Sequence, residues 1–258
     1  MINENKSSYY PEIYPYKKGV YSPYNKLYIM PKMKNLLTFI LLIIGLKVFA
    51  TPQIPDILIY NGKEYEWSGY SPAFKYFELN NFQPPEEAVI TTGNYSVFIM
   101  TYEIVDRKLY LIDVEIEVEQ ESEYGSDYPP DLVSKSLFKN YFPNEKRILM
   151  DFYSNIQLIP YGEIIEVTKN DWTDIHWEDY LVFEIKNGTV ITELDLNYKQ
   201  FNRLKRKQFR AFKKTTEYQK TTELEKENLN GFNEFRPNKF TMDEYLELII
   251  LRLIKRLK

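Results

Sequence analysis

The sequence of 258 residues contains no cysteine and a single histidine. Without cysteine there is no disulfide framework, no thiol nucleophile and no cysteine ligand for zinc or an iron–sulfur cluster. One histidine cannot supply the two or three imidazoles of a usual zinc site. We therefore expect no metal and no cofactor. The fold must be held by its apolar core, for which the 44% of apolar residues are sufficient.

Glycine is also scarce, with nine residues in the whole chain. The sequence has no Gly-x-Ser-x-Gly nucleophile motif. It has no phosphate-binding loop, no dinucleotide-binding glycine motif and no His-Glu-x-x-His pair. Enzymatic activity is therefore left open, and the absences favour a protein that is not an enzyme.

Long apolar runs are missing except for one, at 36–46 in "MKNLLTFILLIIGLKVFA". Its roughly 11 residues span about 16 Å as a helix, whereas a bilayer core is about 30 Å thick. A lysine precedes the run and Val-Phe-Ala ends it, as in a secretory signal peptide. We predict a signal peptide at 33–50, cleaved between Ala50 and Thr51. An uncleaved anchor and a buried helix are the alternatives.

The residues in front of this run, 1–32, are rich in tyrosine, proline, asparagine and lysine and show no periodicity. A signal peptide belongs at the start of translation, so we interpret 1–32 as a disordered extension from a misassigned start codon. Translation would then begin at Met33 or Met30. The rival interpretation is a cytoplasmic tail before a membrane anchor. The chain is expected to be exported, to the periplasm, the cell surface or the medium.

Charge is unevenly distributed along the remaining sequence. Residues 51–197 hold 10 basic and 27 acidic residues, whereas residues 198–258 hold 16 basic and 8 acidic ones. We predict an acidic β-rich body, 51–197, and a basic helical segment, 198–258, that packs on it and neutralises it. A basic arm for an anionic partner is the alternative.

The residue patterns predict an α+β fold, in which an antiparallel sheet built from hairpins is followed by C-terminal helices. Asn61-Gly62 and Asn187-Gly188 are strong hairpin signals, and a third turn is expected at 106–108. Strands are expected at 57–60, 63–67, 95–105, 109–119, 148–153, 156–159, 163–168, 180–186 and 189–196. Helices are expected at 73–79, 132–141, 197–228 and 241–258, the last with a capping box from Thr241 to Glu244. Turns are expected at 160–162, a helix break at 229–239 and a loop at 169–180.

Two periodic patterns indicate buried faces. In the strand at 109–119 alternation places one apolar set on a single face: Tyr110, Ile112, Val114, Ile116 and Val118. In the helix at 197–228 one side carries an interrupted apolar set: Tyr198, Phe201, Leu204 or Lys205, Gln208 and Phe212. We expect the sheet to be buried on one side and the helix to be half docked.

The sole histidine, His176, lies among acidic and aromatic residues in "KNDWTDIHWEDY". If the chain is an enzyme, the weak catalytic candidates are Asp171, Asp174, His176 and Glu178. Trp172 and Trp177 are candidates for stacking on a glycan. The alternative is a polar loop whose tryptophans anchor it to the sheet.

Two charged surfaces are further candidates. Asp113, Glu115 and Glu117, followed by Glu119, place carboxylates about 6.7 Å apart on one strand face, which suits a binding surface or a merely solvated face. The run 199–214 contains eight basic residues and no acidic one. It resembles a nucleic-acid-binding helix. Because an exported protein rarely meets nucleic acid, we expect no nucleic-acid partner.

Three segments resemble a family of uncharacterised exported bacterial proteins: "IPDILIYNGKEY", "TYEIVDRKLYLIDVEIE" and "YLVFEIKNGTVITELDLNYKQFNRLKRKQFRAFKKTTEYQK". In that family a signal peptide is followed by an Ile-Pro-Asp…Tyr-Asn-Gly-Lys-x-Tyr start. The resemblance covers most of 54–220. It implies export and a start near Met33, and it implies no activity.

Three hypotheses follow. The first is an exported, non-enzymatic protein that binds a protein or glycan partner and meets a membrane only through its signal peptide. The second is a carboxylate-based hydrolase of glycan or peptide. The third is an inhibitor or immunity-type protein, whose acidic surface would attract a basic partner by electrostatic steering.

Overall fold

A computed structural model describes residues 53–67, 69–120, 131–169, 172–234 and 236–258, without the side chains of Lys169 and Trp172. These residues belong to one compact unit, Thr51–Lys258. The predicted extension at 1–32, the signal peptide at 33–50 and the cleavage site at Ala50 and Thr51 lie outside the described residues.

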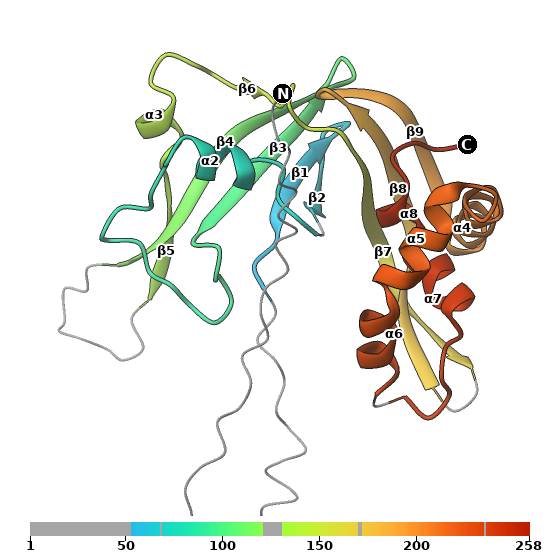
Figure 1. The fold of residues 1–258 in the computed structure, drawn as a ribbon. Coiled ribbons are helices and arrows are strands. Elements are labelled where there is room, and N and C mark those ends of the chain that lie inside the picture. Colours follow the sequence, from blue (N-terminus) through green and yellow to red (C-terminus); the bar gives the residue numbers. More distant parts are fainter. Residues whose placement is uncertain (1–52, 68, 121–130, 170–171, 235) are drawn as a thin grey trace, which may run out of the picture. The chain divides into compact units, whose positions relative to one another are not determined.

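The predicted α+β class is confirmed (Figure 1). The strands are β1 (Asp56–Tyr60), β2 (Lys63–Trp67), β3 (Phe98–Val105), β4 (Lys108–Glu119), β5 (Leu132–Ser136), β6 (Ile148–Leu149), β7 (Asn155–Lys169), β8 (Trp172–Lys186) and β9 (Thr189–Asn197). The helices are α2 (Phe74–Leu79), α3 (Phe138–Tyr141), α4 (Tyr198–Phe212), α5 (Thr216–Leu224), α6 (Lys226–Asn233), α7 (Met242–Leu248) and α8 (Ile250–Leu253). The strand order is β2-β1-β3-β4-β9-β8-β7, with β5 and β6 also paired to β4. Among these described strands β1 and β3 are parallel, and the other pairs are antiparallel.

The three predicted hairpins are present. Each turn is closed by two residues with positive φ: Asn61 (50°) and Gly62 (72°), Asp106 (49°) and Arg107 (61°), Asn187 (47°) and Gly188 (70°). Two consecutive positive φ values give the turn a twist that matches the flanking strands. The middle turn is one residue shorter than predicted, because Lys108 already pairs with Val105.

Two predictions for segments that pair with β4 were wrong. The first half of the predicted helix at 132–141 is strand β5, which pairs with Glu115–Glu119 of β4, and only Phe138–Tyr141 is helical. The predicted strand at 148–153 is reduced to the two residues of β6. In both places the decisive interaction is backbone pairing with β4, which is remote in the sequence and leaves no local signal.

The turn predicted at 160–162 and the loop predicted at 169–180 are both strand. β7 runs on through a bulge between Tyr161 and Ile164, where Gly162 has φ 81°. β8 begins at Trp172 and pairs with β7 along the length of both strands. Glycine and proline here mark a bulge, which lets the strand bend without ending it.

The alternation predicted for β4 holds only in its second half. A register shift opposite Thr101 and Tyr102 changes which face each residue occupies. As a result Leu109 and Leu111 join Val114 and Ile116 in the core, whereas Tyr110 and Ile112 are only partly buried. A one-residue shift moves every following side chain to the other face.

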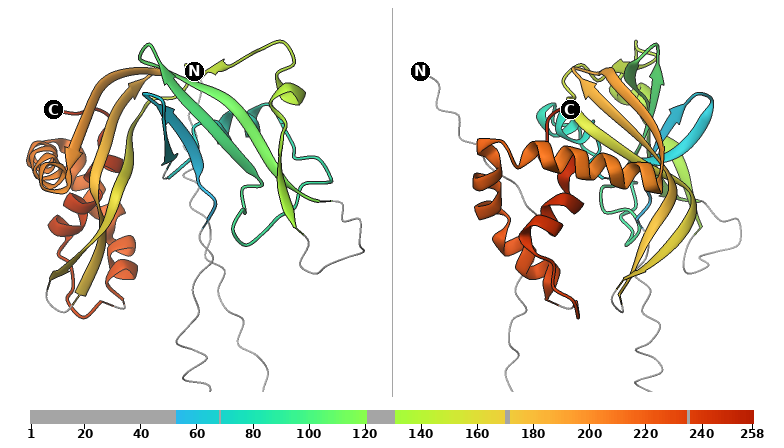
Figure 2. Two further views of the ribbon diagram at one scale, coloured as in Figure 1. Left: turned by 180° about the vertical axis from the view of Figure 1, so that it is seen from behind. Right: turned by 90° about the vertical axis from the view of Figure 1, so that its right-hand side faces the viewer.

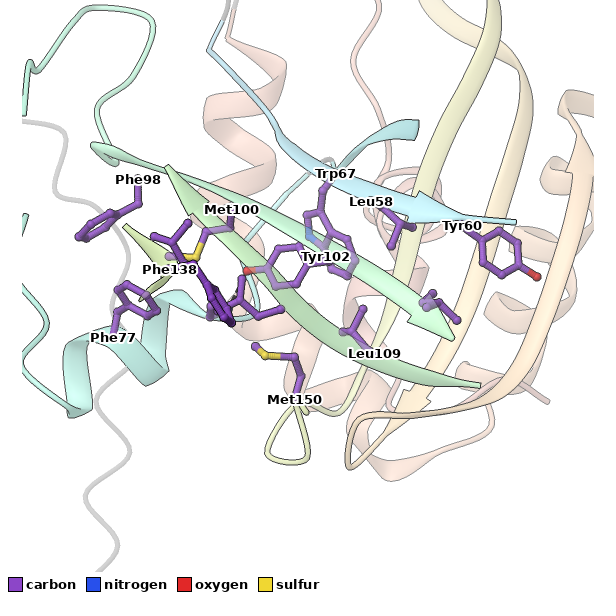
Figure 3. Close-up of a cluster of buried hydrophobic side chains, with 14 of the residues drawn as sticks. Leu58, Tyr60, Trp67, Phe77, Phe98, Met100, Tyr102, Leu109, Phe138 and Met150 are labelled. Atoms are coloured by element: carbon purple, nitrogen blue, oxygen red, sulfur yellow. Dashed lines mark hydrogen bonds between the residues drawn. The ribbon is translucent and has the colours of Figure 1, made fainter. Parts of the chain in front are cut away.

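Two hydrophobic cores are built on the sheet. The first lies around β1, β3, β4, α2 and α3, and Figure 3 shows Trp67 beside Tyr102 within it. The second lies between β7–β9 and the C-terminal helices. Strand β8 serves both, because Leu181 and Phe183 belong to the first core while Tyr180 and Val182 belong to the second.

The predicted helix at 197–228 is divided into α4, α5 and the beginning of α6. Asn197 and Gln200 form a capping box at the start of α4, and the buried side of α4 is close to the one predicted: Phe201, Lys205, Gln208, Phe209 and Phe212. The second view of Figure 2 shows α4 along its length, with the shorter helices beside it. The break expected at 229–239 begins late, since α6 continues to Asn233.

The predicted C-terminal helix begins as expected, with a complete capping box between Thr241 and Glu244. It is not continuous, because Ile249 (φ −97°, ψ 9°) separates α7 from α8, and Ile254 is extended. The last basic residues therefore lie beyond the helix. Among the described residues no helix is both long enough and apolar enough to cross a membrane.

Candidate functional site

Of the residues proposed as a site, Asp174 and His176 lie on β8 and contact the helical segment. The His176 ring lies 4.7 Å from the Tyr198 ring, centroid to centroid. Asp174 pairs with Arg236, Oδ1 to Nη1, at 3.5 Å. Burial and the nearby Lys205 lower the pKa of His176, although Asp174 acts in the opposite direction. His176 is thus neutral near pH 7 and forms part of the packing between sheet and helices.

The other members of that set are not gathered at one place. The Trp177 side chain packs partly buried against the second core, and its backbone N–H donates to the Tyr180 hydroxyl at 3.0 Å. Glu178 lies beside Gly162 in the β7 bulge. Asp171 and the Trp172 side chain are outside the described residues. Within the described part of the chain, no three histidine, aspartate or glutamate side chains come together as a metal site.

Asp113, Glu115 and Glu117 of β4 are partly buried, whereas Glu119 is exposed. Asp113 Oδ1 accepts hydrogen bonds from Ser136 Oγ (2.6 Å) and from the Val114 N–H (2.8 Å). Thr91 Oγ1 donates to Glu117 at 3.5 Å. Burial, aided by the charge of Asp113, raises the pKa of Glu115. Asp113 and Glu117 thus contact β5 and the segment around Thr91. Their side chains are less accessible to a partner than those of a fully solvated strand face would be.

A pocket of about 430 Å³ lies beside β1 and β3, within the size range of small-molecule sites. Three segments that are distant in the sequence supply its lining: 53–56, 67–74 and 96–100. Their juxtaposition depends on the parallel pairing of β1 with β3, which sets Ile57 opposite Thr101. Gln53 and Ile54 fix the rim through hydrogen bonds to the carbonyls of Thr92 and Gly93.

One carboxylate lies in this pocket, and a hydrogen-bonded chain holds it. Asp56 accepts from the Met100 N–H (2.9 Å) and from Ser71. Ser71 Oγ lies 2.6 Å from the Tyr102 hydroxyl, which itself accepts from the Ala73 N–H (2.9 Å). The consistent direction is Tyr102 donating to Ser71 and Ser71 donating to Asp56. Burial raises the pKa of Asp56, and these two donors oppose that rise.

Aromatic rings form much of the pocket wall: Trp67, Tyr70, Phe74 and Phe98. Trp67 is fixed by its indole N–H, which donates to the Tyr70 carbonyl at 3.3 Å, and by the Tyr102 ring at 4.9 Å. Tyr70 and Phe74 meet edge to face at 5.6 Å. Among the described lining residues there is no lysine or arginine, and Asp56 is the one ionisable acid apart from the tyrosine hydroxyl.

The residue patterns do not predict this pocket. Its carboxylate stands in the Ile-Pro-Asp start, and its rings come from a turn-rich stretch that shows no period. The cluster of aromatic and serine residues in "WSGYSPAF" was the available signal.

We find no protein-family model, no curated protein and no solved structure that matches the chain. The resemblance to exported bacterial proteins therefore stays a prediction.

Proposed function

We propose that the chain is an exported binding protein and that the pocket beside β1 and β3 binds a small organic cation. The observation that carries this proposal is a single carboxylate, Asp56, set among aromatic rings with no basic residue in the lining. The ligand class replaces the protein or glycan partner expected from the sequence.

An organic cation fits both features of the pocket. A cation within about 6 Å of an aromatic ring is attracted to the ring face, most strongly for tryptophan. A carboxylate has about four acceptor positions, and described residues supply donors for two of those on Asp56. The remaining capacity suits an ammonium or guanidinium group, whose charge would also offset the cost of burying Asp56.

The pocket favours binding over hydrolysis. Carboxylate-based glycoside hydrolysis needs two carboxyl groups across the scissile bond. Asp56 is the one carboxylate among the lining residues. Ser71 lies next to an acid and a tyrosine, and no lining residue is a histidine or lysine that would activate it as a nucleophile.

Calorimetric titration of the chain from Thr51 onward with choline and with 3,3-dimethylbutan-1-ol tests the proposal. The two molecules have nearly the same shape, and only choline carries a charge. We expect choline to bind at least about ten-fold more tightly, which corresponds to about 1.4 kcal/mol. Equal binding of the two ligands would show that the pocket does not select a cation.

Two charge-neutralising variants locate the site. Asp56→Asn keeps an oxygen for the Met100 N–H and removes the charge, so choline binding should fall at least about ten-fold. Glu64→Gln removes an exposed charge from the same hairpin and should leave binding unchanged. If Asp56→Asn binds choline as well as the parent chain does, or if choline, putrescine and arginine all fail to bind, the proposal is wrong.

We further propose export, with cleavage between Ala50 and Thr51 and membership of the exported bacterial family that 54–220 resembles. The signal-like features of 33–50 support this. N-terminal sequencing of the native protein tests it, and a start distant from Thr51 would contradict it.

A further inference from the structure

The outward face of α4 is a continuous stripe of positive charge. It consists of exposed residues that recur every three or four positions, five on α4 and two in the turn that follows it: Lys199, Arg203, Arg206, Lys207, Arg210, Lys213 and Lys214. At 3.6 residues per turn they fall within an arc of about 120°. Residues 198–214 contain no aspartate or glutamate. We call these seven residues the cationic stripe.

The orientation of the cationic stripe is fixed by the opposite side of α4. Phe201, Phe209 and Phe212 are buried in the second core, and Phe201 stacks on Tyr180 with 4.1 Å between ring centroids. Gln208 exchanges hydrogen bonds with the backbone of Lys258, Nε2 to O at 2.9 Å and N to Oε1 at 3.0 Å. The helix therefore cannot turn its cations toward the acidic body.

Ion pairs with described residues engage two of the seven cations. Arg206 pairs with Glu247 at 3.8 Å and Lys213 with Asp243 at 3.1 Å. The other five cations form no ion pair with any described residue. Between the helical segment and the sheet, the described residues contribute one ion pair, Arg236 with Asp174. Among the described residues, the contacts of opposite charge between the basic segment and the body gather at Asp174, which pairs with Arg236 and also attracts Lys205.

We propose that the cationic stripe docks the protein on a lipid bilayer surface that carries anionic headgroups. The exposed cations lie along one side of a helix about 22 Å long, so they can reach a plane of phosphates together. The phenylalanines between them are buried and cannot stack on bases, which removes the usual platform for single-stranded nucleic acid. Each lysine or arginine near an anionic surface contributes about a five-fold gain in binding.

This inference is independent of the pocket and departs from the expectation that the chain meets a membrane only through its signal peptide. α4 would lie on the surface without inserting, because its exposed face is charged and its apolar face is already covered. Docking by charge alone weakens with added salt, since exposed charges are screened over about 10 Å at 0.1 M.

Sedimentation with lipid vesicles tests the proposal on the chain from Thr51 onward, which forms one compact unit without the apolar run. The vesicles contain phosphatidylcholine alone or with about one third phosphatidylglycerol, and salt is varied. We expect binding to the anionic vesicles, loss of binding at high salt, and no binding to the neutral ones. Absence of binding to anionic vesicles at low salt would overturn the proposal.

Two quadruple variants with the same net charge separate this surface from overall charge. One replaces Lys199, Arg203, Lys207 and Arg210 by glutamine. The other replaces the exposed Lys63, Lys75, Lys146 and Lys186 by glutamine. We expect the first to lower vesicle binding at least about 50-fold and the second to change it by less than about five-fold.

Equal loss in both variants would mean that net charge alone drives the adsorption, and the cationic stripe would not be a docking surface. A poly-uridylate titration is run in parallel. Binding of that RNA through the same four residues, with no binding to vesicles, would assign the cationic stripe to nucleic acid and overturn the lipid proposal. Unchanged thermal unfolding in both variants confirms that the fold is intact.

Discussion

The pocket beside β1 and β3 and the helix α4 use charged and aromatic side chains in opposite ways. In the pocket a single carboxylate is enclosed, and rings such as Tyr70 and Phe74 are left exposed. On α4 the rings are buried, and the cations are displayed to solvent. This difference is the basis of the two proposals, a small ligand for the pocket and a large anionic surface for α4.

The largest expected effect is a difference in stability between removing a buried ring beneath α4 and removing an exposed ring at the pocket. Phe209 is 4% exposed beneath α4, whereas Phe74 at the pocket is 43% exposed. Phe209→Ala should lower the free energy of unfolding by about 3–5 kcal/mol, because it leaves a cavity. Phe74→Ala should lower it by about 0.5 kcal/mol or less. Urea denaturation measures both, and similar losses would remove the contrast between a structural ring and a ring available to a ligand.

The two Asn-Gly turns extend the comparison, because one belongs to the hairpin beside the pocket and the other joins β8 to β9, the strand that leads into α4. Gly62 and Gly188 both have positive φ, so alanine costs about 1–2 kcal/mol at either position. A Cβ on Gly62 meets open space, but one on Gly188 would lie 2.7 Å from the Met150 carbonyl oxygen. Gly188→Ala should therefore cost about 1–3 kcal/mol more than Gly62→Ala in the same denaturation experiment. Equal losses of stability in the two variants would show that the Met150 backbone moves away from the new Cβ at little cost in free energy.

The pocket's charge should make ligand binding dependent on pH. Burial raises the pKa of Asp56, so its charged form is lost at a higher pH than for an ordinary aspartate. Choline affinity should be constant near neutral pH and should fall about ten-fold for each pH unit below the pKa of Asp56. Calorimetry between pH 7 and pH 3 measures this. The contribution of Asp56 to stability has the other sign, because protonation favours the folded state as the pH falls.

The smallest expected effect is a change of stability with pH that arises from His176, which contacts Tyr198 of α4. Its pKa is lowered, so the unfolded chain takes up a proton below pH 6.5 while the folded chain still does not. Stability should therefore decrease slightly as the pH falls from 6.5 toward the folded pKa. The chain has one histidine, so a single imidazole signal in a proton NMR titration reports that pKa directly. A midpoint above 6.5 would contradict the lowered pKa.

The sequence predicted those parts of the fold that depend on neighbouring residues. The Asn-Gly hairpins, the capping box at Thr241 and the buried side of α4 follow from local turn and helix chemistry. The residue pattern failed where backbone pairing with another strand decides the outcome, as in β5 and in β8 around His176. The polar residues 174 and 176 were predicted to lie in a loop, but they pair with β7 and contact the helical segment.

The pocket could not be predicted for the same reason. Asp56, Ser71 and Met100 are adjacent only because β1 lies parallel to β3, and a parallel pairing of two short strands leaves no periodic signal. The cationic residues of α4 were visible in the sequence. What the sequence did not reveal is that their helix is held with these side chains facing away from the acidic body.

Strand β8 gives the molecule an unusual sensitivity to misfolding. Because alternate residues of β8 enter different cores, a slip of one position along its neighbours would send each core the other's side chains. A single register error would therefore disrupt the packing of both cores. The two-residue turn at Asn187 and Gly188 fixes the register of β8 against β9, so this one turn helps to specify the contents of both cores.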